Sequence, residues 1–166
     1  MRTLFLSREE VRNPLADEIK RAGKIVKEKG LVEGNYGNIS ARYGKRMVIT
    51  ATGSDLGNLS NEDMVEVVDY NPATDVAMVI GLKEPSTETP MHWLLYRRED
   101  INAIIHVHAT FEEAPTSEKY AKEGTLELAM EAIKALKNSK IANLRGHGSV
   151  AVGVNMEDAL RVLKCL

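Results

Sequence analysis

Apolar residues near the start of the chain recur at the spacing of an α-helix. Asn13 followed by Pro14 is typical of a helix start, because asparagine can cap the first turn and proline suits the first helical position. The apolar residues that share one face of this segment are Leu15, Ile19, Ala22 and Val26. Gly30 is suited to end a helix, so we expect one between Pro14 and Gly30.

Shorter runs of β-branched and apolar residues alternate with further helix starts. These runs predict strands at residues 39–42, 47–51, 64–69, 76–80, 103–108, 141–144 and 150–154. We expect helices to begin at Thr89, at Thr125 and at Asn155, the last of them continuing to Leu166. Because strands and helices are interspersed without strict alternation, the pattern indicates an α/β layered domain with a mixed sheet.

The composition narrows the class of protein. The chain has 166 residues and no repeat or linker, which indicates one domain spanning residues 1–166. Its formal net charge of −2 excludes the strong basic field expected of a nucleic-acid-binding protein. No apolar run approaches the roughly 20 residues of a membrane span, and the start of the chain does not resemble a signal peptide. Cys165, the one cysteine, has no partner for an internal disulfide, so we expect a reducing, cytoplasmic location.

Three of the four histidines form a candidate metal site. His106 and His108 lie two positions apart in a predicted strand, so their side chains share one face. His147 is the candidate third ligand, because its flanking glycines let the backbone bend close to a ligand, and catalytic zinc typically takes three protein ligands. The spacing is equally compatible with a half-exposed strand that binds no metal. His92 falls in a predicted helix, where we expect it to support its neighbours.

Three stretches contain the glycines and small polar residues that bind anions through exposed backbone N–H groups. They are residues 34–40, 50–54 and 85–92, and the last leads into a predicted helix start, which favours a phosphate. Each is also explained by an ordinary turn or a capped helix start. Glu88 differs, because a purely structural carboxylate would repel an anion bound there. We therefore consider it a general base or a labile metal ligand, against the alternative of an ordinary first-turn glutamate.

The order of these motifs along the chain is informative. It runs through Gly37-Asn38-Ile39-Ser40, Thr52-Gly53, Ser86-Thr87-Glu88 with Pro90-Met91-His92, His106-x-His108 and Gly146-His147-Gly148. Taken together, the ordered set resembles the class II aldolase and adducin family, in particular its zinc-dependent L-fuculose-phosphate aldolases. The resemblance extends from about residue 15 to the end of the chain.

The resemblance implies a three-layer α/β/α fold around a mixed sheet, and a homotetramer with its sites at subunit interfaces. It makes His106, His108 and His147 the ligands of one zinc ion per subunit. Glu88 corresponds to the acidic residue that contacts the zinc or exchanges a proton with the substrate. The positions that match the phosphate-binding residues of the family are Gly37, Asn38, Thr52, Gly53, Ser86 and Thr87.

The activity implied by the resemblance is that of an aldehyde-lyase acting on a small sugar phosphate. Such an enzyme reversibly cleaves a ketose 1-phosphate, for example L-fuculose 1-phosphate, to dihydroxyacetone phosphate and an aldehyde. Relatives commonly continue with a tail that helps to close the site, which this sequence does not contain, so the residues of the aldehyde half are not assigned. The alternatives are a pentulose-phosphate 4-epimerase, a methylthioribulose-phosphate dehydratase and a non-catalytic adducin-like binding module.

Overall fold

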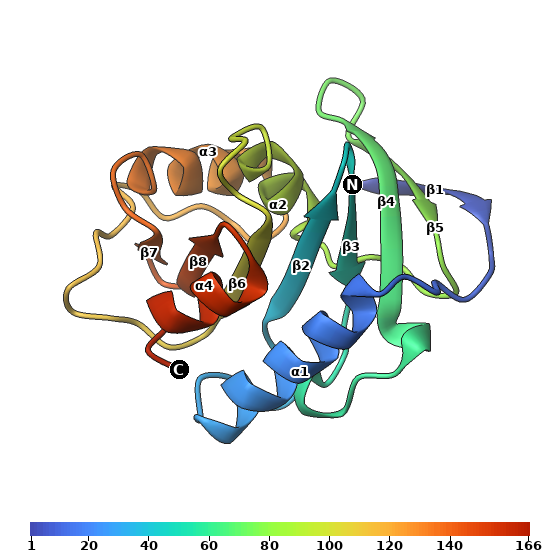
Figure 1. Ribbon diagram of the computed structural model, residues 1–166. Coiled ribbons are helices and arrows are strands. Elements are labelled where there is room, and N and C mark those ends of the chain that lie inside the picture. Colours follow the sequence, from blue (N-terminus) through green and yellow to red (C-terminus); the bar gives the residue numbers. More distant parts are fainter.

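The computed structural model describes residues 1–166 and contains twelve regular helices and strands (Figure 1). The strands are β1 (Arg2–Ser7), β2 (Asn38–Tyr43), β3 (Arg46–Thr50), β4 (Met64–Asn71), β5 (Val76–Ile80), β6 (Ala103–Val107), β7 (Ile141–Leu144) and β8 (Gly148–Gly153). The helices are α1 (Leu15–Glu28), α2 (Thr89–Leu95), α3 (Leu126–Ala135) and α4 (Met156–Val162). Two short 3-10 turns, Leu56–Asn58 and Asn61–Asp63, precede β4.

All the strands form one sheet, in the order β1-β5-β4-β3-β2-β6-β8-β7. Only β1 and β5 are parallel, and the other neighbouring pairs are antiparallel, so the expected mixed sheet is confirmed. In the register of β2, β6 and β8, Asn38 and Val150 lie on either side of His106. The middle of the sheet therefore places residues from three distant parts of the sequence side by side.

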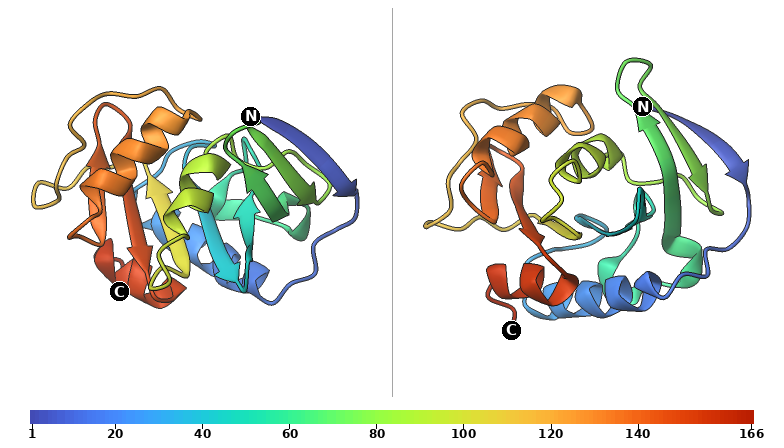
Figure 2. Two further views of the ribbon diagram at one scale, coloured as in Figure 1. Left: turned by 90° about the horizontal axis from the view of Figure 1, so that it is seen from above. Right: turned by 45° about the horizontal axis from the view of Figure 1, so that its top comes forward.

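Helices cover the sheet on both faces, which makes three layers (Figure 2). On one face, α1 and α4 contribute Ile19, Val26 and Leu160 to a core that also contains Ile105 of β6. On the other face, α2 and α3 pack over residues that include Ile104. The alternation of side chains along β6 thus divides its residues between two cores.

The chemistry of the helix starts agrees with the sequence analysis. The side chain of Asn13 accepts a hydrogen bond from the backbone N–H of Leu15 at 2.9 Å. Thr125 caps α3, and Asn155 caps α4 by accepting from the N–H of Asp158 at 2.8 Å. These caps satisfy N–H groups that the first helical turn leaves without partners.

The structure differs from the sequence analysis at both ends of the chain. The sequence pattern predicts no element at Arg2–Ser7, where exposed and partly buried positions do not alternate between polar and apolar residues. This segment forms β1 through its pairing with β5, which no local pattern predicts. The last helix ends at Val162 and does not reach Leu166. Lys164 takes a left-handed conformation with φ of 60°, and the N–H of Cys165 bonds back to Leu160, which closes the helix.

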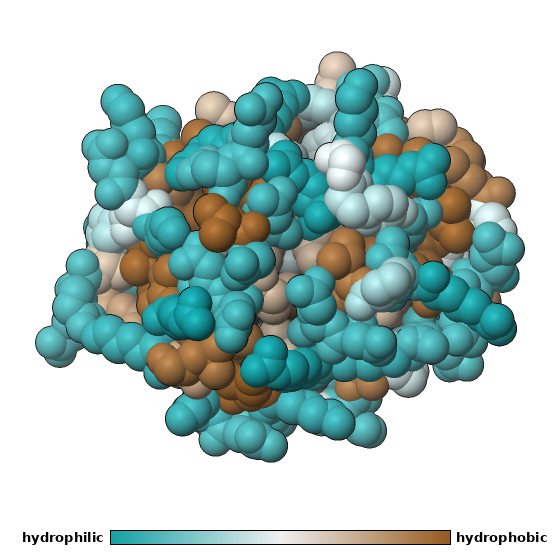
Figure 3. Space-filling model, in the orientation of Figure 1, coloured by the Kyte–Doolittle hydropathy of each residue, from teal (hydrophilic) through white to brown (hydrophobic).

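Hydrophilic side chains cover much of the face shown in Figure 3, with smaller apolar groups between them. The larger exposed apolar residues include Leu4 and Leu6 of the edge strand β1. None of the helices is long and apolar enough to cross a membrane.

Candidate active site

The histidines predicted to share one face gather at the end of β6. The ring centroids of His106 and His108 are 5.4 Å apart. The His147 ring stacks on that of His106 at 4.8 Å, with 18° between the planes, and lies 5.6 Å from His108. His108 and His147 are 39 positions apart in the sequence. They lie close together because β8 pairs with β6 and His147 lies in the turn before β8.

The glycine after His147 is required by this turn. Gly148 has φ of 106°, and a Cβ atom there would lie 2.2 Å from the carbonyl oxygen of Val107. A side chain at this position would push the turn away from the end of β6. The expectation that glycine brings His147 close to the other histidines is consistent with this contact.

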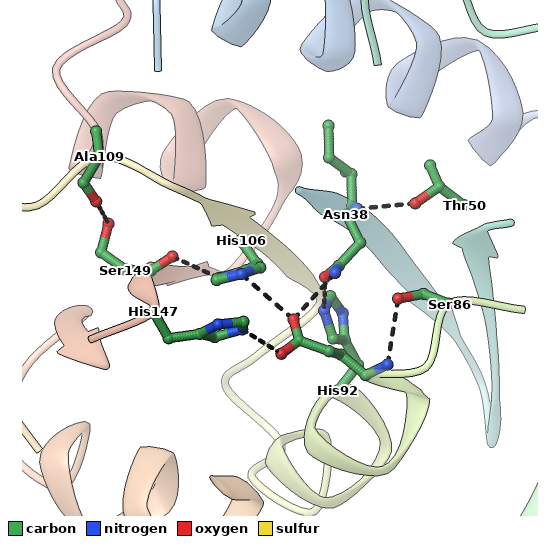
Figure 4. Close-up of polar contacts among 10 residues, drawn as sticks. Asn38, Thr50, Ser86, His92, His106, Ala109, His147 and Ser149 are labelled. Carbon is green, nitrogen blue, oxygen red and sulfur yellow. Dashed lines mark hydrogen bonds and ion pairs between the residues drawn. The ribbon is translucent and has the colours of Figure 1, made fainter. Parts of the chain in front are cut away.

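Glu88 lies immediately before α2 and is 1% exposed. One carboxylate oxygen accepts from Nε2 of His147 at 2.7 Å, and the other from Nδ2 of Asn38 at 3.0 Å. That second oxygen is also 3.4 Å from Nε2 of His106. Figure 4 shows the rings of His106 and His147 pointing in the same direction, with the Asn38 side chain nearby. The carboxylate thus connects side chains from β2 and β6 with the turn before β8.

The protonation states of this cluster depend on one another. Burial opposes ionisation of Glu88, but its interactions with His106, His147 and Asn38 together bring its pKa below the ordinary value. The hydrogen bond to Glu88 raises the pKa of His147. Burial lowers the pKa of His106, which favours its neutral ring. The cluster therefore contains an ionised carboxylate next to a neutral imidazole.

The arrangement of His106 fits a metal ligand. Its Nδ1 lies 2.9 Å from the carbonyl oxygen of Ser149, and because a carbonyl only accepts, Nδ1 carries the ring proton. Nε2 then presents a bare lone pair, and it is a buried polar side-chain atom without a hydrogen-bond partner. A lone pair facing the Glu88 carboxylate is repulsive unless a cation lies between them. A backbone carbonyl that orients the ring in this way is typical of metal-binding histidines.

The candidate ligand atoms of Glu88, His106 and His147 all lie within 4.8 Å of one another. His108 lies outside this closest group, with an exposed side chain whose ring lies 4.8 Å from that of Tyr36. Imidazole and carboxylate together are donors that suit zinc and other divalent transition metals. The donor set is therefore compatible with a divalent metal, without selecting one.

The six residues predicted to bind phosphate line one pocket next to these histidines. They come from the loop after α1 and the start of β2, from the turn after β3 and from the loop before α2, and the pocket wall includes His106 and His108. The phosphate-candidate residues in the wall are Gly37, Asn38, Thr52, Gly53, Ser86 and Thr87. At Gly37, with φ of 85°, a Cβ atom would lie 2.9 Å from the His106 carbonyl oxygen, so the loop approaches β6 closely only without a side chain.

Four further residues line the pocket. Asn35, Tyr36 and Ala51 fall within the stretches 34–40 and 50–54 that were expected to bind anions, although they were not assigned individually. Glu123 comes from the irregular stretch before α3. No local pattern places that carboxylate near the histidines, because its position depends on the path of the loop after β6.

Comparisons with known proteins agree with this site. The chain matches the family described as Class II Aldolase and Adducin N-terminal domain over residues 17–118. It is 33% identical over 172 residues to the L-fuculose phosphate aldolase of Escherichia coli strain K12, covering 90% of this chain and 77% of that protein. The L-fuculose phosphate aldolase of Methanocaldococcus jannaschii is 32% identical over 163 residues, which cover 85% of this chain and 84% of that protein.

A solved structure of an L-fuculose 1-phosphate aldolase superposes with a TM-score of 0.80 at 27% sequence identity, covering 94% of this chain and 82% of that chain. The chain belongs to the class II aldolase and adducin family. Within it, the protein is a class II aldolase and thus a lyase. The fold expected from the resemblance, an α/β domain with a mixed sheet, is confirmed.

Proposed function

We propose that the protein is a zinc-dependent aldolase that reversibly cleaves a ketose 1-phosphate, such as L-fuculose 1-phosphate, to dihydroxyacetone phosphate and an aldehyde. The observation that carries the proposal is the bare Nε2 of His106, which faces an ionised carboxylate. The pocket of small polar residues adjoins this atom. A metal site and an anion site side by side suit a substrate with a phosphate near its reacting carbons.

We assign His106, His108 and His147 as the ligands of one zinc ion per subunit, with Glu88 as a further labile ligand. Zinc, when bound, supplies a Lewis acid for the oxygen atoms of the substrate on which negative charge develops. The backbone carbonyl of Ser149 orients His106 for this role.

Glu88 is the proposed proton-exchanging group. In condensation the ionised carboxylate removes a proton from the carbon of dihydroxyacetone phosphate that attacks the aldehyde. In cleavage it first takes up the proton that the substrate hydroxyl loses as the aldehyde forms, and then returns a proton to that same carbon. Its carboxylate is 1% exposed and has a lowered pKa, so it is ionised and shielded from bulk water. The side-chain NH2 group of Asn38 and the ring of His147 donate hydrogen bonds that hold this carboxylate in one orientation.

The substrate phosphate is assigned to the pocket formed by Gly37, Asn38, Thr52, Gly53, Ser86 and Thr87. Backbone N–H groups and hydroxyls there would hold the end of the substrate that does not react. Binding energy from this distant group positions the carbon–carbon bond that breaks. The net charge of the chain is only −2, so local groups rather than a general field would attract the phosphate.

The experiment combines metal analysis with two substrates. Purified protein is loaded with zinc, its metal content is measured, and it is incubated with L-fuculose 1-phosphate or with ribulose 5-phosphate. We expect about one zinc per chain and release of dihydroxyacetone phosphate from the first substrate. The same protein treated with a chelator is the control.

The other outcomes separate the alternatives. Interconversion of the pentulose phosphate without release of a fragment would replace the aldolase by an epimerase. Elimination of water from methylthioribulose 1-phosphate would indicate a dehydratase. A protein that retains no zinc and turns over none of these compounds would favour a non-catalytic adducin-like module.

We further propose a single domain over residues 1–166, a cytoplasmic location and a homotetramer with the sites at subunit interfaces. The one cysteine, Cys165, is free, which fits a reducing compartment. Light scattering during size-exclusion chromatography would measure the mass of the assembly. A monomer that is fully active would contradict the interfacial sites.

A further inference from the structure

A chain of buried hydrogen bonds leads from Tyr96, at the end of α2, to Glu88. The Tyr96 hydroxyl lies 2.7 Å from Oγ of Ser40, which lies 2.7 Å from Nδ1 of His92. Nε2 of His92 lies 2.6 Å from Oδ1 of Asn38, and Nδ2 of Asn38 lies 3.0 Å from Glu88. All five residues are buried, and His92 is 0% exposed. Figure 4 shows the His92 ring next to the Asn38 amide.

The spacing of these residues matches a helix against a strand. Glu88, His92 and Tyr96 lie four positions apart, and backbone bonds from His92 to Glu88 and from Tyr96 to His92 place them on one helical face. Asn38 and Ser40 lie two apart on β2 and therefore share one face. Four helical residues rise about 6 Å, and two strand residues rise about 6.6 Å. Successive side chains on the helical face therefore lie opposite successive side chains on the face of β2.

Every bond in the chain has only one possible direction. The ionised Glu88 only accepts, so Asn38 turns its NH2 group toward it and its oxygen toward His92. Nε2 of His92 must then carry the ring proton. The His92 ring is fully buried and its two hydrogen-bond partners, Ser40 and Asn38, are uncharged, so the neutral ring has one proton and Nδ1 is an acceptor.

The far end of the chain follows from that tautomer. Ser40 donates its hydroxyl hydrogen to Nδ1 of His92, and its oxygen accepts from the hydroxyl of Tyr96. A rotated Asn38 amide would face its oxygen toward the Glu88 carboxylate and its NH2 group toward the His92 N–H. Both contacts would be repulsive, so the tautomer of His92 selects one orientation of Asn38.

We propose that His92 is a positioning residue, which acts through Asn38 to hold the Glu88 carboxylate in the orientation needed for catalysis. The inference rests on the proposed role of Glu88 in proton exchange. His92 neither lines the phosphate pocket nor offers a candidate ligand atom, and its ring reaches both only through Asn38. Partners that orient groups at a metal site typically change activity by about 10-fold to 100-fold when they are lost.

The first test replaces His92 by two side chains of different chemistry. In His92→Phe the ring volume remains but the donor to Asn38 is lost, so we expect kcat to fall by about 10-fold to 100-fold. Zinc content should stay near the wild-type value, because the three histidine ligands are intact. KM should change less than kcat, because Asn38 is the one proposed phosphate residue that hydrogen-bonds to the His92 side chain. His92→Gln can again donate an amide N–H to Asn38, and it should recover most of kcat.

A matched pair of tyrosine variants provides a milder test. Tyr96→Phe and Tyr70→Phe each remove a buried phenolic hydroxyl that forms a 2.7 Å hydrogen bond, and only Tyr96 belongs to the chain to Glu88. We expect Tyr96→Phe to lower kcat several-fold and Tyr70→Phe to leave it unchanged. This comparison remains available if His92→Phe does not fold.

The ring nitrogen resonances of His92 provide a readout that needs no substrate. We expect the 15N NMR spectrum of the wild-type protein to show a proton on Nε2 and none on Nδ1. The opposite tautomer would overturn the inference, as would a zinc-loaded His92→Phe variant with wild-type kcat or a His92→Gln variant as slow as the phenylalanine one. A wild-type protein that cleaves no sugar phosphate would instead refute the proposed function.

Discussion

The two faces of the central strands differ sharply in chemistry. On the face covered by α1 and α4, β6 contributes Ile105 and Val107, and β2 contributes Ile39, all fully buried among apolar side chains. On the face covered by α2, the same strands contribute Asn38 and His106, which are almost as deeply buried. One pair of strands therefore builds an ordinary core on one side and a polar cluster on the other.

The difference separates what stabilises the fold from what serves chemistry. An apolar face lowers the free energy of the folded state by removing hydrocarbon from water. A buried polar group contributes little net stability when it is paired, and costs about 1–3 kcal/mol when it is not. Nε2 of His106 is such an unpaired atom. The proposed metal site accounts for this atom, whereas folding alone does not, so variants on the two faces should behave differently.

The largest effect is expected on the polar face, from His106→Ala. Without this imidazole the zinc content should fall far below one per chain, and turnover should fall by at least about 1000-fold, because the Lewis acid is lost. Metal analysis and the aldol cleavage assay measure the two quantities. A variant that keeps full metal content would remove His106 from the ligand set.

Glu88→Gln should have the next largest effect. The amide keeps the shape of the side chain but cannot accept a proton, so we expect kcat to fall by about 100-fold to 1000-fold. Circular dichroism should show an unchanged fold. Turnover within a few-fold of the wild-type rate would exclude Glu88 from proton exchange.

Ile105→Ala is the matched change on the apolar face. It opens a cavity in the core between the sheet and the helices α1 and α4, and should lower the free energy of unfolding by about 2–5 kcal/mol. Below the unfolding transition, the activity per folded molecule should stay near the wild-type value. Urea unfolding gives the first quantity, and a large loss of kcat in the folded variant would show that the two faces are coupled.

The smallest effect is expected from Glu123→Gln at the pocket edge. Glu123 places a carboxylate in the wall of the proposed phosphate pocket, where it repels an anion. Removing an exposed charge there should lower KM for the sugar phosphate about two-fold to three-fold, and less at high salt. Kinetics at two ionic strengths would measure this. An increase in KM would instead indicate that Glu123 helps to bind the substrate.

Most of the fold could be predicted from local patterns. Helix starts at Leu15, Leu126 and Met156 follow from capping residues and apolar spacing, and β6 follows from its β-branched run. β1 could not be predicted, since an edge strand of mixed character is defined only by the strand with which it pairs. The end of α4 depends on the left-handed conformation of Lys164. Glycine usually takes this conformation at the end of a helix, so a lysine there does not predict it.

The candidate site likewise has features that local sequence predicts and features that depend on tertiary structure. Alternation in a strand is a local property, so the sequence by itself determined that His106 and His108 share a face, and which glycines permit sharp turns. Only the tertiary structure decided that Glu88 lies against His106 and His147, while His108 lies against Tyr36. Contacts between distant segments depend on strand order and loop paths, which local periodicity does not encode. The hydrogen bond between His92 and Asn38 also depends on tertiary structure, because it requires α2 to pack in register on β2.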